Sequence, residues 1–410
     1  MTKHAGGLAL STDDPAVARA VAALEHDLLR YGKGVAAFLD GPAPGSDCAL
    51  AVAYAAAVHL FAMTADGRER ARPLIRRAVR LASAATEREQ LVVAGVAVWA
   101  AGDDARAVAI HAEAVRRWPS DLVPAKILLF LQLNAGDFAG MLACTSALVR
   151  AAPENGFVHG MHAFSLEQTG DLLAAERAGR MAAAMNDDPW AHHAVAHVLD
   201  DAGRAREGRE WMRANAGAWD DCSSFMYTHN WWHAALFEIA LGDHRAALDL
   251  FDARVWGVRR DSCQDQVNAV SLLVRFELLG LDVGDRWADL APHLEKRIAD
   301  RANAFLDLHY AYGLARAGRD GAVERQLRGL HVTDGRPAEF REAVADAAEG
   351  MVAHARGQYG RAATRLESAR AWLPRFGGSR TQRRLVDLVR EDSGRRSTSR
   401  ASGPARAAVA

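Results

Sequence analysis

The stretch GDDARAVAIHAEAVRRWP, residues 102–119, contains the pattern on which the fold of this chain depends. It opens on Gly-Asp, continues through an Ala-rich segment whose apolar residues lie three and four positions apart, and closes on proline. This spacing predicts a helix with one apolar face. Glycine relieves the turn before the helix and proline cannot continue it, so the segment predicts one helix with two defined ends.

The same glycine turns between Ala-rich segments recur along the chain. Glycines followed by Asp or Arg, or by a close variant, lie next to Ala-rich segments at Gly67, Gly102, Gly136, Gly170, Gly203, Gly242, Gly318 and Gly357. The first four intervals between them are 35, 34, 34 and 33 residues. A helix–turn–helix unit of about 34 residues is the tetratricopeptide signature. The sequence therefore predicts an all-α protein, a right-handed α-solenoid of tetratricopeptide-like helix pairs.

The two ends of the chain differ from this repeating middle. Residues 1–14 are polar and contain glycine, which predicts a flexible N-terminus without a signal peptide. Residues 15–388 are expected to form a single helical-repeat domain, because a solenoid grows by stacking and needs no single large core. Residues 389–410 contain almost no large apolar side chains, which predicts a disordered tail.

Composition and charge indicate which kinds of binding partner the protein is not expected to have. The chain has 50 basic and 51 acidic residues, for a formal net charge of −1. Nucleic-acid-binding proteins concentrate positive charge on one face, so this balance argues against a nucleic-acid partner. No apolar run approaches the roughly 18 residues that a membrane span needs, so no membrane partner is expected. Four cysteines without a CxxC pair suit reduced thiols and a cytoplasmic protein.

Histidine and tryptophan crowd into the centre of the chain. Residues 189–252 hold six of the sixteen histidines and five of the ten tryptophans. Histidine pairs recur about one repeat apart, from His193 to His229 and from His197 to His233. A helical repeat that places imidazoles at related heights in successive units can build one shared polar site. We therefore expect a His/Trp-rich functional centre within residues 189–310.

Several blocks in this region resemble a known family. They are WAHHAVAHV (190–198), HNWWHAALF (229–237) and GDHRAALDLFD (242–252), and together they are similar to the tetratricopeptide repeat protein 38 family and its bacterial relatives. The resemblance covers roughly residues 8–375. One departure is Glu167-Gln168-Thr169-Gly170, where the family tends to have Glu-Glu-Thr-Gly. The resemblance implies an all-helical repeat fold and implies little about activity.

The repeat register predicts which side chains line the concave groove. The turn glycine is taken as position 15 of a unit, and positions 2, 5, 6 and 9 of the first helix line the groove of tetratricopeptide domains. On or beside these positions, the side chains predicted to contact a ligand are Trp190, His193, His197, His229, Asn230, Trp232, His233, Asp307 and His309. His159 and His162 fall on positions that pack in the core, so we expect them to be structural.

Three interpretations of this centre stay open. In the first, imidazoles, indoles and carboxylates form a concave pocket that binds a peptide or a small acidic ligand. In the second, the protein is an enzyme that uses the same His/Asp cluster in acid–base roles or as ligands of a divalent metal ion. The ligands for such an ion are His193, His197, His229 and His233, with Asp265 or Asp307 completing the sphere. In the third, the histidines are structural and the protein is purely a protein–protein scaffold.

Catalytic signatures do not decide between these interpretations. The sequence contains no HExxH, GxSxG or GxxxxGK[ST] motif. Paired acids at Asp200/Asp201 and Asp220/Asp221 flank helix ends or turns, where capping is their expected role. No catalytic residue is therefore assigned from the sequence.

Overall fold

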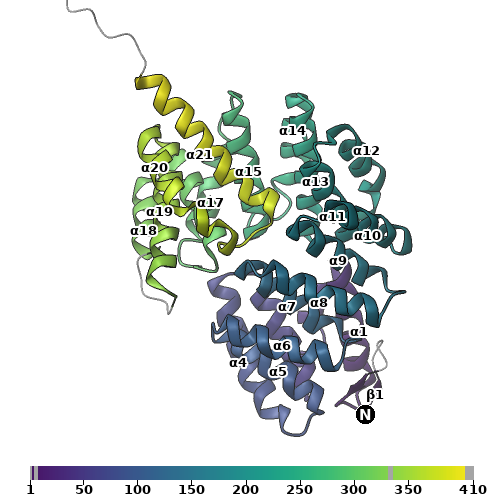
Figure 1. Cartoon of the computed structure of the whole chain (residues 1–410). Coiled ribbons are helices and arrows are strands. Elements are labelled where there is room, and N and C mark those ends of the chain that lie inside the picture. Colours follow the sequence, from purple (N-terminus) through teal and green to yellow (C-terminus); the bar gives the residue numbers. More distant parts are fainter. Residues whose placement is uncertain (1, 4–7, 331–335, 402–410) are drawn as a thin grey trace, which may run out of the picture. The chain divides into compact units, whose positions relative to one another are not determined.

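The structure is a computed structural model that describes residues 2–3, 8–330 and 336–401, and structural statements below concern these residues. The chain divides into two compact units, Met1–Asn268 and Ala269–Ala410, which are described one at a time. Both units are built from consecutive helices (Figure 1). The predicted all-α solenoid of tetratricopeptide-like helix pairs is confirmed.

The first unit opens with two short paired strands and continues through antiparallel helix pairs. In chain order the elements are β1 (Thr2–Lys3), β2 (Ala9–Leu10), α1 (Pro15–Arg30), α2 (Gly34–Asp40), α3 (Ala49–Phe61), α4 (Ala65–Ala82), α5 (Glu87–Ala100), α6 (Asp104–Arg117), α7 (Leu122–Ala135), α8 (Phe138–Ala151), α9 (Gly156–Thr169), α10 (Leu172–Met185), α11 (Pro189–Asp201), α12 (Ala205–Asn215), η1 (Ala216–Asp221), α13 (Ser224–Ala240), α14 (His244–Leu250) and η2 (Phe251–Val255).

The second unit repeats the same construction. Its elements are α16 (Arg286–Glu295), α17 (Ala304–Arg316), α18 (Asp320–Leu330), α19 (Ala338–Ala355), α20 (Tyr359–Ala369), η3 (Arg370–Arg375) and α21 (Arg380–Ala401), while α15 (Cys263–Leu278) begins in the first unit and ends in the second. Not one of the described helices is both long and apolar enough to cross a membrane.

Most of the turn glycines that the sequence predicts lie at helix ends. Seven of the eight predicted turn glycines have positive φ, between 67° and 94°, and follow the first helix of a pair. The prediction for Gly67 is wrong, because this residue lies inside α4, where a Cβ would come within 2.4 Å of the His59 carbonyl oxygen. The turn before α4 is made instead by Met63, with φ 52°. Close helix packing thus explains a glycine that resembled a turn signal.

The first helices of neighbouring repeats lie side by side in the first unit. Helix α11 packs against α9 before it and α13 after it, and each of these helices also packs against its own partner, α10, α12 or α14. The start of α11 is fixed by Asp188, whose side chain accepts a hydrogen bond from the Trp190 amide at 3.0 Å, and by Pro189 in the first turn. Side chains on facing sides of α11 and α13 are therefore brought together.

A segment from the start of the chain is attached to this stack. Helix α1 packs against α7 and ends at Tyr31, which takes the left-handed conformation with φ 57°. The Tyr31 carbonyl accepts a hydrogen bond from the Ser223 amide at 2.6 Å, and Gly32 pairs with Cys222 in an isolated bridge. The N-terminal segment thereby joins the chain just before α13.

The boundaries of the predicted single domain differ from the structure in detail. Helix α21 continues to Ala401, past the expected boundary at residue 388, because Val389 and Ser393 are buried and the helix packs against α19 and α20. Paired strands occupy part of the stretch 1–14 that was expected to be flexible. Residues 402–410 of the predicted tail lie outside the described residues. The domain limits stay a prediction.

Candidate functional site

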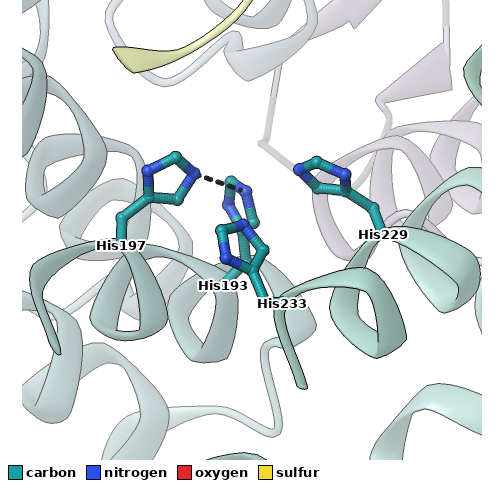
Figure 2. A group of neighbouring side chains, drawn as sticks. All are labelled: His193, His197, His229 and His233. Carbon is teal, nitrogen blue, oxygen red and sulfur yellow. Dashed lines mark hydrogen bonds between the residues drawn. The ribbon is translucent and has the colours of Figure 1, made fainter. Parts of the chain in front are cut away.

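Four histidines gather between α11 and α13 (Figure 2). His193 and His197 lie one turn apart on α11, and His229 and His233 lie one turn apart on α13. Residues four positions apart share one face of a helix, so each helix presents two rings to the other. One nitrogen from each of the four rings lies within 4.8 Å of the other three. The structure therefore brings together four of the five histidines assigned to the groove.

The four imidazole side chains are almost completely buried. His193 and His229 are 2% exposed, and His197 and His233 are 0% exposed. Burial, reinforced by the neighbouring imidazoles, holds the pKa of His193 well below its usual range. Burial also lowers the pKa of His229 to about 3. These two rings are therefore neutral at physiological pH, with a lone pair on one nitrogen of each.

Aromatic side chains form the walls of the cluster. The Trp190 ring lies 4.6 Å from the His193 ring, and the Trp232 ring stacks on His229 at 5.1 Å with an interplanar angle of 8°. Phe164 contacts the rings of His193 and His197. Phe225 stacks on His229 from another side at 5.3 Å. Such walls exclude water and fix the orientation of the imidazoles.

Polar groups lie behind two of the rings. His229 donates its Nδ1–H to the Asn268 Oδ1 at 2.9 Å, because a carboxamide oxygen only accepts. His197 directs Nδ1 toward the Glu167 carboxylate at 3.6 Å, where both side chains are 0% exposed. The His229 ring then keeps its Nε2 lone pair. The His197 Nε2 lies 3.0 Å from His193 Nε2, the contact drawn as a dashed line in Figure 2.

Two further predicted residues serve the framework of the site. The Asn230 side chain donates to the Pro189 carbonyl oxygen at 3.3 Å and so links α13 to the start of α11. Trp232 is 0% exposed and contacts His229 and His233 with its ring. Both side chains support the cluster from within the core. Their predicted contact with a ligand stays a prediction.

Asp307 and His309 belong to the second unit, and their contacts are made inside it. Asp307 accepts a hydrogen bond from Gln326 at 2.7 Å and lies 3.5 Å from the Arg301 guanidinium, while burial raises its pKa to about 6. His309 donates Nδ1–H to the Phe305 carbonyl oxygen at 2.7 Å, and burial lowers its pKa to about 4. We do not include these two residues in the cluster.

The histidines expected to be structural form local contacts. His159 Nε2 donates to the Pro153 carbonyl oxygen at 2.6 Å, and the ring is 6% exposed. His162 Nδ1 lies 3.1 Å from the Thr145 hydroxyl. Both contacts brace the α8–α9 pair. Asp265, the other proposed metal ligand, lies 3.3 Å from the Ser224 hydroxyl, and burial raises its pKa to about 7.

Three polar residues near the cluster were missed at the sequence level. Glu167 and Asn268 lie on α9 and α15 and gave no signal, because their role depends on which helices become neighbours. Lys126 on α7 did give one. It stands ten residues before the turn glycine Gly136, as His193 stands ten before Gly203. The rule that selected His193 therefore also selects Lys126.

Two surface cavities lie elsewhere on the described residues. One, of about 800 Å³, is lined by second-unit residues including Glu277, Tyr312, Arg316 and His354. The other, of about 340 Å³, lies over α12–α14 and is lined by Arg209, Trp231 and Glu238 among others. Neither cavity is lined by a histidine of the cluster.

No protein-family model matches the chain. Among solved structures it is similar to a human IFIT1 dimer with PPP-AAAA, at 15% identity over 86% of this chain and 83% of that one, with a TM-score of 0.46. It is also similar to the APC/C Cut9–Hcn1 hetero-tetramer, at 14% identity over 82% of this chain and a TM-score of 0.42, where it spans 62% of that chain. The P58(IPK) TPR domain aligns at 12% identity over 78% of this chain and all of that chain, with a TM-score of 0.22.

Likenesses at this level carry no information on function. The chain itself shows consecutive antiparallel helix pairs, positive-φ glycines at the turns and first helices lying side by side. On these features the chain is a helical-repeat protein of the tetratricopeptide-like type.

Proposed function

We propose that the first unit is a metal-binding module in which His193, His197, His229 and His233 hold one divalent transition-metal ion. The observation that carries the proposal is the placement of four imidazole nitrogens, one from each ring, within 4.8 Å of one another. Imidazole is a preferred ligand of zinc, copper, nickel and iron. The helical repeat supplies the scaffold, and a relationship to the tetratricopeptide repeat protein 38 family is part of the same proposal.

The spacing of the nitrogens is close to what an ion requires. Zinc lies about 2.0–2.1 Å from an imidazole nitrogen, so ligands at tetrahedral corners are about 3.3 Å apart. The His193 and His197 Nε2 atoms are already 3.0 Å apart. The remaining nitrogens lie within 4.8 Å of one another, so a contraction of up to about 1.5 Å is needed, which is within the reach of χ rotations. An ion would also replace the hydrogen bond between the two Nε2 atoms.

The groups behind the rings also suit a metal centre. Metal-bound histidines usually donate their second nitrogen to a carboxylate or carbonyl oxygen, which fixes the ring and raises its basicity. Glu167 stands behind His197, and Asn268 stands behind His229, in this arrangement. Glu167 and His197 are both 0% exposed, so this support belongs to the same buried site.

The charge state of the rings favours an ion over direct binding of an acidic ligand. An imidazole attracts a carboxylate most strongly when it is protonated, and the lowered pKa of His193 and His229 disfavours that form. A metal ion, in contrast, binds neutral imidazole. An enzymatic role would additionally require a coordination position open to a substrate.

The proposal is tested by metal analysis of the full-length protein. Purified protein is loaded with zinc, dialysed and analysed by mass spectrometry beside the double variant His193→Ala/His233→Ala and the control His26→Ala, which changes an exposed histidine. We expect about one ion per chain in the wild type and the control, and a loss of at least tenfold in the double variant. Circular dichroism checks that each variant is folded.

Two results contradict the proposal. One is a wild-type protein that retains almost no zinc, copper, nickel or iron when each is offered in turn. The other is a folded double variant that retains the wild-type amount.

A further inference from the structure

Lys126 is an unusual cation on the edge of the histidine cluster. The chain contains only four lysines, at positions 3, 33, 126 and 296, among 50 basic residues. The Lys126 ammonium lies 3.9 Å above the Tyr31 ring and 5.3 Å from the Trp190 ring. Among the described residues it has no hydrogen-bond or ion-pair partner within 4.0 Å, and its side chain is partly exposed. An amine held against two aromatic rings keeps its hydrogen-bond donors available.

Trp190 contributes a second donor without an acceptor. Its indole Nε1–H is buried and has no hydrogen-bond partner among the described residues. Burying a donor without a partner costs about 1–3 kcal/mol, so an acceptor that reached this N–H would recover that cost on binding. The same indole contacts Lys126 on one side and His193 on another.

His193 connects this edge to the metal centre. Its Nδ1 is buried and has no hydrogen-bond partner among the described residues. When Nε2 binds an ion, the ring proton resides on Nδ1, which becomes a third donor beside Trp190. Donors on three neighbouring side chains are suited to an oxyanion.

Asp188 is the opposing charge at this edge. One of its oxygens caps α11 through the Trp190 amide, and the other lies 2.6 Å from the position that a Cβ on Gly160 would take. Burial raises the pKa of Asp188 to about 7 and lowers the pKa of Lys126 to about 7, while the attraction between the two groups partly offsets both effects. The two groups are within electrostatic reach but more than 4.0 Å apart, so Asp188 does not occupy the donors of Lys126.

We infer that Lys126 and Trp190 form a binding site for a small monocarboxylate beside the four-histidine centre. A single ammonium matches one negative charge, and a planar carboxylate has two oxygens for the two donors. The inference deepens the proposed function and rests on it in one respect, since a carboxylate held at Trp190 adjoins the ion ligand His193. An acidic ligand can then bind beside neutral imidazoles, because the positive charge that attracts it comes from Lys126 and the ion.

Acetate is the test ligand, and saturation-transfer NMR measures its dissociation constant with the full-length protein. Four proteins are compared, each with and without zinc: the wild type, Lys126→Met, Trp190→Phe and the control Lys33→Met, which removes an exposed lysine. Lys126→Met keeps the apolar stem, and Trp190→Phe keeps a ring but removes the Nε1–H. Zinc content and circular dichroism are recorded for every sample.

We expect Lys126→Met to weaken acetate binding at least about tenfold, the loss typical of a hydrogen bond to a charged group. Trp190→Phe should weaken it severalfold, and Lys33→Met should leave it unchanged. The zinc content should be the same in the wild type, Lys126→Met and Lys33→Met, and the zinc content of Trp190→Phe is measured so that its acetate affinity is compared at equal metal loading.

The outcomes separate the two proposals. Equal acetate affinity in folded Lys126→Met and wild type, or no acetate binding by zinc-loaded wild type, overturns the carboxylate site and leaves the metal centre standing. Acetate binding that depends on Lys126 in a protein that takes up no metal supports the carboxylate site and overturns the metal centre.

Discussion

At the scale of single residues, the four imidazoles differ in what stands behind them. His197 faces the Glu167 carboxylate, and His229 faces the Asn268 carboxamide. A carboxylate behind an imidazole raises the basicity of the ring more than an amide does, because it carries a full negative charge. Glu167 should therefore affect metal affinity without being a ligand.

Replacing Glu167 with glutamine is expected to lower zinc affinity about 10- to 100-fold while leaving one ion per chain at saturation. Isothermal titration of the wild type and the variant measures both quantities. The control is Glu176→Gln, which alters a carboxylate of α10 that pairs with Arg180 and Arg204 instead. An unchanged zinc affinity in Glu167→Gln would show that this carboxylate does not support the centre.

His111 leads to a prediction about acid stability. The ring is 0% exposed, and burial lowers its pKa to about 4 from an ordinary value of 6.5. Below pH 6.5 the His111 ring is protonated in the unfolded chain but stays neutral in the native protein. The contribution of this ring to the free energy of unfolding is therefore fully present above pH 6.5 and is lost as the pH decreases toward 4. At about 1.4 kcal/mol per pH unit, this ring alone should cost about 3 kcal/mol by pH 4.

The variant His111→Gln should lack that contribution. Denaturant unfolding of both proteins at several pH values gives the difference in their free energies of unfolding, in which the other histidines cancel. That difference should change by about 3 kcal/mol between pH 7 and pH 4. A constant difference would mean that His111 titrates normally in the native protein.

The sequence could predict the cluster but not its supports. The i,i+4 spacing and the repeat register placed His193, His197, His229 and His233 on facing helices, because both depend only on helix geometry. Glu167 and Asn268 lie on helices whose neighbours are decided by tertiary packing. Lys126 occupies the same repeat position as His193, ten residues before the turn glycine, so the register rule identifies it as well.

At the scale of elements, the α12–α13 contact depends on the absence of a side chain. A Cβ on Gly208 would come within 2.2 Å of the Phe237 ring, which is itself fully buried. Glycine there lets the two helices approach closely, and any larger residue must displace an aromatic ring from the core. The second helix of this repeat is thus positioned by one glycine.

Gly208→Ala is expected to lower the free energy of unfolding by about 1–3 kcal/mol through overpacking, even though alanine favours helix formation. Gly217→Ala is the matched control, because a Cβ at that position has no neighbour within 4 Å. Thermal and denaturant unfolding compare the three proteins. A Gly208→Ala variant as stable as the control would mean that Phe237 moves at little cost.

Helix boundaries were predictable where local chemistry alone sets them. Turn glycines such as Gly136 and Gly203 need positive φ, and the sequence marks them directly. Gly67 carried the same signal for another reason, the close approach of α3 and α4. The extension of α21 could not be read from its polar composition, since it depends on burial of Val389 against other helices.

At the scale of the whole molecule, an ion held between α11 and α13 should stabilise the first unit. Ligand binding to the native state alone adds RT ln(1 + [L]/Kd), about 2.7 kcal/mol at a concentration 100 times the Kd. Hydrogen exchange with and without zinc should show slower exchange in α11 and α13 and unchanged exchange in α17 and α19. The double variant His193→Ala/His233→Ala should show no zinc effect, and equal protection of all four helices would contradict a site confined to the first unit.

The attachment of Tyr31 near Ser223 has a consequence for the order in which the molecule is assembled. During synthesis Tyr31 leaves the ribosome long before Ser223 and Trp190, and the ring of Trp190 completes the enclosure of Lys126 that the Tyr31 ring begins. Contacts so far apart in sequence form late in folding, because a long loop must close first. The aromatic enclosure of the lysine should therefore be among the last parts of the first unit to mature.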